Sequence, residues 1–227
     1  DWDLHNHLIG QQGSRAALNT PVLVIEQAAL ERNIAAMAAF AKTRGIALRP
    51  HAKTHKSVDI ARMQLAAGAV GVCCAKLGEA EALAEGGVGA ILITSPVVTP
   101  QAIARLAELH VRIDDLRVAS DNPENVAALA RAVAKASRPL TVLVDIDPGI
   151  RRTGVPTPEA AVNLARQIAN EPALRFGGVQ FYCGAQQHIE SYADRRAAIV
   201  DRTDYLRGIV ERLSAEGLAP ELVTGGG

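Results

Sequence analysis

The feature that most constrains the fold is a repeated alternation of short apolar segments and amphipathic helical segments. The apolar segments lie near residues 46–48, 70–74, 90–93, 116–119, 140–146, 175–181 and 220–224. The helical segments lie near residues 27–44, 57–67, 77–86, 100–109, 122–137, 157–170 and 191–216. The apolar segments do not alternate with polar residues, which is typical of strands buried on both faces. This alternation predicts a parallel sheet with right-handed helical crossovers.

Two architectures have this order of elements, a doubly wound sheet and an eight-stranded barrel. A doubly wound dinucleotide fold carries a G-x-G-x-x-G turn after its first strand, and the sequence has none. Polar residues instead gather at the carboxyl ends of the apolar segments, where a barrel places its active site. We therefore predict an α/β fold, a TIM (β/α)8-like barrel within the domain at residues 21–227, with the segment at 46–48 as its first strand. A further short strand is expected at 21–25, ahead of the first helix. Residues 1–20 are expected to form an extended N-terminal arm.

The predicted barrel is incomplete. Seven strand segments follow the first helix, and the chain closes on a run of three glycines. An open barrel exposes an unpaired sheet edge, so the last strand is expected to be missing from this chain.

Composition narrows the class of protein. Lys and Arg together number 24, as do Asp and Glu, so the formal net charge is zero and no global field attracts nucleic acid or an anionic membrane. Three cysteines, two of them adjacent, do not form a disulfide framework and fit a reducing compartment. The longest apolar stretch, residues 65–75, is about half the ~20 residues of a membrane span. No export signal is visible, so we expect a cytoplasmic location.

The densest polar segment, residues 49–56 (RPHAKTHK), follows the apolar segment at 46–48. In an extended strand His51, Lys53 and His55 share one face. A lysine pointing into a barrel mouth is desolvated and lies near other cations, which lowers its pKa and frees the amine as a nucleophile toward aldehydes. The alternative is a solvated basic turn that binds an anion or nothing.

Thr224, Gly225, Gly226 and Gly227 follow the last apolar segment. Successive glycines let backbone N–H groups converge on a phosphate without interference from a Cβ. Loops after strands seven and eight are the usual phosphate site of barrels. The position of this run favours a phosphate site over a flexible tail.

Two further strand ends carry candidate residues. Arg152 follows the segment at 140–146 and could meet a cofactor ring or a substrate carboxylate, although the neighbouring aspartates and arginines could equally form a structural ion-pair network. Tyr182 could line a ring or bind a phosphate, or simply pack, and His188 could serve in acid–base chemistry.

Together these segments resemble the D-threonine aldolase family of the alanine-racemase-like pyridoxal-phosphate enzymes, which includes D-3-hydroxyaspartate aldolase and D-serine dehydratase. The resemblance covers nearly all of residues 20–227, and its most specific motif is H-x-K-T-H-K at 51–56. The other segments that carry it are 20–24 (TPVLV), 71–74 (GVCC), 144–147 (VDID), 152–155 (RTGV) and 224–227 (TGGG).

The resemblance implies that Lys53 bonds covalently to the pyridoxal-phosphate aldehyde. It implies that Thr224, the glycines 225–227 and Tyr182 hold the phosphate, and that Arg152 lies near the cofactor ring or the substrate. It also implies a C-terminal β domain that carries a histidine-containing site for Mn, Mg or Zn, with no metal ligands in this chain. A homodimer is expected on the same ground.

The implied reaction is metal-assisted retro-aldol cleavage of a small D-β-hydroxy amino acid, such as D-threonine, to glycine and an aldehyde. The candidate bases are His51, His55 and His188. Three alternatives stay open: elimination of D-serine dehydratase type, amino-acid racemisation, and a pyridoxal-phosphate homeostasis protein without turnover.

Overall fold

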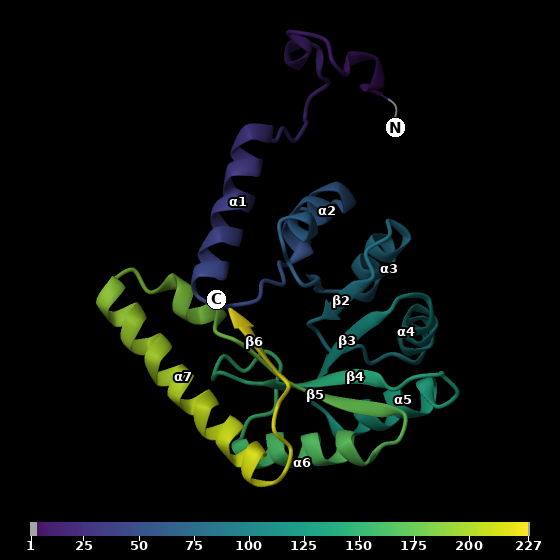
Figure 1. Ribbon diagram of the computed structural model, residues 1–227, viewed down its shortest axis with the longest axis vertical. Helices are drawn as coiled ribbons and strands as arrows, with labels where there is room; N and C mark the ends of the chain where they lie inside the picture. The colour runs from purple at the N-terminus through teal and green to yellow at the C-terminus, as the bar shows by residue number, and fades with distance from the viewer. Residues whose placement is uncertain (1–3, 227) are drawn as a thin grey trace.

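The computed structural model describes residues 4–226 and shows six parallel strands that curl into a half-barrel (Figure 1). The strands are β1 (Val72–Cys74), β2 (Ala90–Ile93), β3 (Asp115–Ser120), β4 (Leu140–Ile146), β5 (Leu174–Tyr182) and β6 (Leu222–Gly226). Each strand pairs with its neighbours in chain order, so the sheet order is β1-β2-β3-β4-β5-β6. This order and the helical crossovers confirm the predicted class, a TIM-like barrel that is not closed within this chain.

The helices match the predicted segments. They are α1 (Gln27–Thr43), α2 (Val58–Ala66), α3 (Leu77–Glu85), α4 (Pro100–Arg112), α5 (Pro123–Val133), α6 (Pro158–Asn170) and α7 (Tyr192–Ala215). The starts of α4, α5 and α6 share one local cause, a Thr or Asn N-cap followed by proline in the first turn. The cap side chain accepts a backbone N–H that has no partner inside the helix, and proline has no N–H to satisfy.

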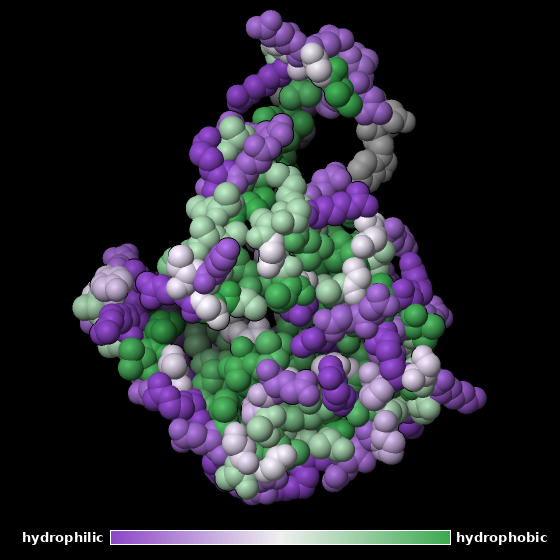
Figure 2. Space-filling model, viewed as in Figure 1, coloured by the Kyte–Doolittle hydropathy of each residue, from purple (hydrophilic) through white to green (hydrophobic). Residues whose placement is uncertain are grey.

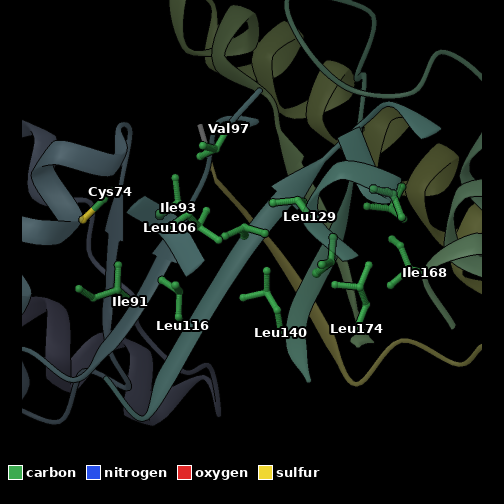
Figure 3. Packing of buried hydrophobic residues seen from close by; sticks show 14 of the residues in the cluster. Cys74, Ile91, Ile93, Val97, Leu106, Leu116, Leu129, Leu140, Ile168 and Leu174 are labelled. Carbon is green, nitrogen blue, oxygen red and sulfur yellow. The ribbon is translucent and has the colours of Figure 1, made fainter. Parts of the chain in front are cut away.

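The two faces of the sheet bury different sets of side chains. The outer face packs against the helices, with Ile91, Leu116 and Leu140 side by side on successive strands (Figure 3). The inner face holds a smaller cluster of Cys73, Leu92 and Leu143, against which Leu222 packs. Because side chains alternate between faces along a strand, polar residues above this inner cluster face the mouth of the half-barrel.

Two predicted strands are wrong. Residues 21–25 form no regular structure and pair with no strand of the described chain, so Leu23 is 97% exposed. Residues 46–48 are not a strand either, but the chain just beyond them runs beside β1. There Val70 N donates to Leu48 O and Cys73 N donates to Pro50 O, each at 2.8 Å, and His51 forms an isolated bridge with Cys73.

The N-terminal region is also not extended as predicted. It contains two short 3-10 helices, η1 (Asn6–Leu8) and η2 (Ser14–Ala17). Helix α1 follows and projects from the body, and it buries Ala41 alone while Met37 and Phe40 remain about half exposed. Hydrophobic surface is visible in this part of the molecule (Figure 2). No helix in the described part of the chain combines the length and apolar character of a membrane span.

Candidate active site

A cavity of about 260 Å³ lies at the carboxyl end of the inner sheet face. It brings together seven predicted site residues, His51, Lys53, Arg152, Tyr182, Thr224, Gly225 and Gly226. Five residues that were not predicted also line it, Arg49, Cys73, Leu92, Thr94 and Gln180. Gly227 lies outside the described residues. Three cations and no acidic side chain line the cavity among the described residues, so it favours an anionic ligand.

Tyr182, the last residue of β5, organises the mouth of the cavity. Lys53 Nζ lies 5.7 Å from the centroid of its ring, and Arg152 Cζ lies 5.0 Å from the same centroid. The Tyr182 hydroxyl accepts a hydrogen bond of 3.1 Å from Gln187 Nε2. The ring therefore holds two cations from different loops beside one opening.

Lys53 lies in η3 (Ala52–Thr54), so the expected strand alternation of His51, Lys53 and His55 is wrong. Its side chain is exposed at the rim, whereas we expected it to be desolvated. The difference arises because a 3-10 turn, and not an inward-facing strand, carries the lysine.

His51 is held by hydrogen bonds at both ring nitrogens. Its Nδ1 accepts from Lys53 N at 3.3 Å, and its Nε2 lies 3.2 Å from Thr94 Oγ1. The Thr94 hydroxyl donates its one hydrogen to Cys74 O, so His51 Nε2 must be the donor in the second contact. Burial and the charge of Lys53 lower the pKa of His51, and the charge of Glu79 partly opposes this shift. The ring is therefore neutral and fixed in one tautomer, and it connects the backbone of Lys53 to Thr94, the residue that follows β2.

The other two predicted histidines do not line the cavity. His55 Nδ1 accepts from Ser57 N at 3.0 Å at the start of α2, and burial lowers its pKa. His188 is exposed at the end of η4 (Gly184–His188), the 3-10 helix that follows β5.

Arg152 lies in the loop after β4, whose backbone is held by hydrogen bonds to the Asp147 carboxylate. The Asp147 carboxylate accepts hydrogen bonds from Gly149 N at 2.9 Å and Arg151 N at 3.0 Å, and Arg151 adopts a φ of +54°. A Cβ at Gly154 would lie 2.4 Å from Asp147 N, so glycine is required there. Asp147 thus shapes the backbone of the loop. Among the described residues, no ion pair joins Asp145 or Asp147 to Arg151 or Arg152, so the predicted alternative of an ion-pair network is not found.

At the inner end of the cavity the buried side chain of Arg49 crosses the backbone of Gly71. A Cβ on Gly71 would lie well within contact distance of the guanidinium. Burial and the nearby Arg117 lower the pKa of Arg49, while Asp115, whose carboxylate lies 3.8 Å from its Nη2, raises it. The sequence signal for this residue was its place two positions before His51.

Thr94 and Gln180 line the cavity, and Gln180 also contacts the buried Asp145, which does not line it. Gln180 Nε2 donates to Thr94 O and to Asp145 Oδ1, each at 2.8 Å. Burial raises the pKa of the Asp145 carboxyl, and the hydrogen bond from Gln180 opposes that rise. Sequence analysis missed Thr94 and Gln180, although a polar residue at the end of an apolar strand was a signal for both.

The described residues fit pyridoxal phosphate. Three cations, one of them the Lys53 amine, surround one cavity together with the aromatic face of Tyr182 and an open glycine edge, where a Cβ on Gly226 would meet nothing within 4 Å. They do not fit a metal ion, because no group of three or more His, Cys, Asp or Glu side chains among them could hold one.

Comparisons with known proteins identify the family of the chain. Residues 25–227 match the family model described as alanine racemase, N-terminal domain. The chain is 44% identical over 211 residues to 3-hydroxy-D-aspartate aldolase of Paracoccus denitrificans (strain Pd 1222), an alignment covering 92% of this chain and 54% of that protein. It is 31% identical over 204 residues to D-threo-3-hydroxyaspartate dehydratase of Delftia sp. (strain HT23), covering 86% of this chain and 53% of that protein.

Among solved structures, D-threonine aldolase from Filomicrobium marinum superposes with a TM-score of 0.90 at 38% identity. That match covers 92% of this chain and 57% of the other. The chain therefore spans about half the length of the relatives it matches. The resemblance inferred from the sequence is confirmed, and the family depends on pyridoxal phosphate. This chain belongs to the alanine racemase N-terminal domain family and has D-threonine aldolase and 3-hydroxy-D-aspartate aldolase among its homologues.

Proposed function

We propose that this chain is the cofactor-binding barrel of a lyase that cleaves small D-β-hydroxy amino acids to glycine and an aldehyde. The observation that carries the proposal is the convergence of Lys53 and Arg152 on the Tyr182 ring, beside a cavity with no acidic lining among the described residues. Similarity to two aldolases of D-configured hydroxy amino acids supports the reaction class.

The described residues divide the binding task between them. Lys53 would bond to the cofactor aldehyde, and Tyr182 would pack beside the cofactor ring. Thr224, Gly225 and Gly226 would hold the phosphate through backbone and hydroxyl donors. Arg152 would pair with the substrate carboxylate. Pyridoxal phosphate, when bound, supplies an electron sink for the bond broken at Cα.

A base must remove the proton of the substrate β-hydroxyl. His51 is unsuited to this role because Lys53 N already donates to its Nδ1 and its Nε2 carries a hydrogen. The His188 ring makes no hydrogen bond to the described residues and stands on the helix that follows Tyr182. Because neither His55 nor His188 lines the cavity, we assign the proton transfer to none of the three predicted histidines, and no step here is assigned to a metal ion.

Product analysis tests the proposal. The protein is incubated with pyridoxal phosphate, a divalent metal salt and D-threonine, and glycine and acetaldehyde are measured. A Lys53→Ala variant should form neither product, while Lys42→Ala, which changes an exposed lysine on α1, should match the parent protein. Equal turnover by the Lys53 variant refutes the assignment.

The similarity to a hydroxyaspartate dehydratase favours elimination as the second candidate function. A dehydratase converts its hydroxy amino acid to an oxo acid and ammonia and forms no glycine. The same assay therefore separates the two reactions, and interconversion of D- and L-alanine identifies a racemase. Binding of the cofactor without any turnover corresponds to the homeostasis class.

A further inference from the structure

The Arg152 side chain is exposed at the mouth of the cavity and contacts the ring of Tyr182. Its Cζ lies 5.0 Å from the ring centroid, and no hydrogen bond or ion pair joins its guanidinium to a described residue. All the guanidinium donors are therefore available to a ligand at this mouth. Because no acceptor in the described chain fixes the side chain, the backbone of its loop decides where the guanidinium stands.

The loop is anchored on both sides of Arg152. Before this residue, the hydrogen bonds to the Asp147 carboxylate shape the chain. After it, Val155 N donates to Asp145 O at 2.9 Å, and Asp147 N donates to Val155 O at 3.1 Å. These two backbone contacts return the chain to the end of β4, so the loop is closed at its base.

A further anchor comes from a different strand. Asp121 follows β3, and its Oδ2 accepts a hydrogen bond of 2.9 Å from Gly154 N, two residues after Arg152. Gly154 is held close to the end of β4, because its φ is +101° and a Cβ there would lie 2.4 Å from Asp147 N. A carboxylate acceptor makes this contact one of the stronger types of hydrogen bond to a backbone N–H.

The carboxyl edge of the sheet brings Asp121 close to Arg152. Ser120 on β3 is the ladder partner of Val144 on β4, so Asp121 and Asp145 follow at the same edge. Burial raises the pKa of Asp145, the charge of Asp121 adds to this rise, and the charge of Arg152 opposes it. The two carboxyl groups and the guanidinium therefore lie in one cluster.

We propose that Asp121 is a positioning residue that holds the loop so that Arg152 meets the substrate carboxylate, an inference that rests on the proposed function. Asp121 does not line the cavity, so it acts through the backbone of the loop. Without its carboxylate, the half-buried N–H of Gly154 loses its acceptor, which is costly. The loop then moves to expose this N–H to water, and Arg152 moves with it.

A pair of ligands isolates the contact to the substrate carboxylate. D-Alanine and D-alaninamide both carry the amine that reacts with the cofactor, but only D-alanine carries a carboxylate. Neither has a β-hydroxyl group, so retro-aldol cleavage does not occur during the measurement. The affinity of each ligand for the full chain loaded with pyridoxal phosphate is read from the change in cofactor absorbance. The ratio of the two affinities reports the carboxylate contact.

Substitution of Asp121 should change this ratio in a way that a general disturbance of the fold does not. In Asp121→Ala the preference for D-alanine should fall about tenfold, as for the loss of one hydrogen bond to a charged group. Arg152→Gln should lose at least as much of the preference. Asp121→Asn removes the charge but keeps an oxygen acceptor, so it should retain most of the preference. Asp114→Ala, which changes an exposed aspartate at the other end of β3, should match the parent chain.

Hydrogen exchange tests the contact to Gly154 without any variant. In the parent chain loaded with pyridoxal phosphate, the Gly154 amide is followed by NMR after transfer to deuterated water. It should exchange more slowly than the same amide in an unstructured peptide by about tenfold or more, because exchange requires the hydrogen bond to open. Exchange at the rate of an unstructured peptide overturns the inference.

The outcomes separate the two proposals. If both ligands bind and the ratio is the same in the parent chain and in Asp121→Ala, the role of Asp121 is refuted and the proposed function stands. A ratio that rises in both Asp121 variants shows repulsion between the two carboxylates and also refutes it. If neither ligand changes the absorbance of the cofactor, both proposals fail together.

Discussion

Replacing Gly178 by alanine should detach β6 from β5 and disturb the glycine edge of the cavity. Gly178 has a φ of +128°, a conformation that residues with a side chain rarely adopt. An added Cβ would lie in contact with the backbone of Leu222, with its carbonyl oxygen the nearest atom. Backbone atoms of a paired strand cannot rotate away, so β6 must move.

The size of the effect follows from two contributions. Strain at a backbone conformation that favours glycine costs about 1–3 kcal/mol. Gly178 and Leu222 form the first pair of the β5–β6 ladder, and each ladder hydrogen bond lost costs roughly a further 1 kcal/mol. We therefore expect Gly178→Ala to lower the free energy of unfolding by about 2–5 kcal/mol.

Urea unfolding followed by circular dichroism measures this change. The matched control is Gly208→Ala inside α7, where an added Cβ meets nothing within 4 Å. This control should raise the free energy of unfolding by about 0.5–1 kcal/mol, because glycine is unfavourable in a helix. If Gly178→Ala is as stable as the parent protein, the close approach of β5 and β6 described here is wrong.

Three further predictions concern side chains in and around the cavity. Asp145→Asn should stabilise the protein at neutral pH, because burial raises the pKa of the Asp145 carboxyl above its ordinary 3.8 and penalises the ionised form. The gain in the free energy of unfolding, measured in urea titrations, should shrink toward pH 4. A gain that grows on acidification contradicts this reasoning. Cys73 and Cys74, whose pKa burial raises to about 11 and about 12, should resist iodoacetamide at pH 8 until the protein unfolds, as mass spectrometry can verify. Thr94→Val removes the acceptor of His51 Nε2 and should cost about 1–3 kcal/mol in urea unfolding, whereas no change would argue against that hydrogen bond.

Local signals were sufficient to predict most of the helices and the parallel sheet. The pairs Thr99–Pro100 and Thr157–Pro158 fix where α4 and α6 begin because capping depends on neighbouring residues alone. The fully buried apolar run of β4 likewise identified a central strand. These features depend on short sequence windows, which is why they could be predicted.

Features that depend on distant neighbours could not be predicted in this way. The β-branched residues 21–25 predict a strand, but a strand forms only where a partner edge is available. The rim position of Lys53 depends on the turn of η3, and the orientation of the Gln180 amide depends on Thr94 and Asp145, which are distant in the sequence. The motif identified the lysine, and the three-dimensional contacts identified its surroundings.

The central claim is that the amine of Lys53 bonds reversibly to the cofactor aldehyde, and chemical trapping tests it most directly. The protein is mixed with pyridoxal phosphate and reduced with borohydride, and the digested peptides are mapped by mass spectrometry. We predict one pyridoxyl group, attached to Lys53. Modification of Lys56 or Lys76 instead, or unchanged labelling in a Lys53→Ala variant, would contradict the account.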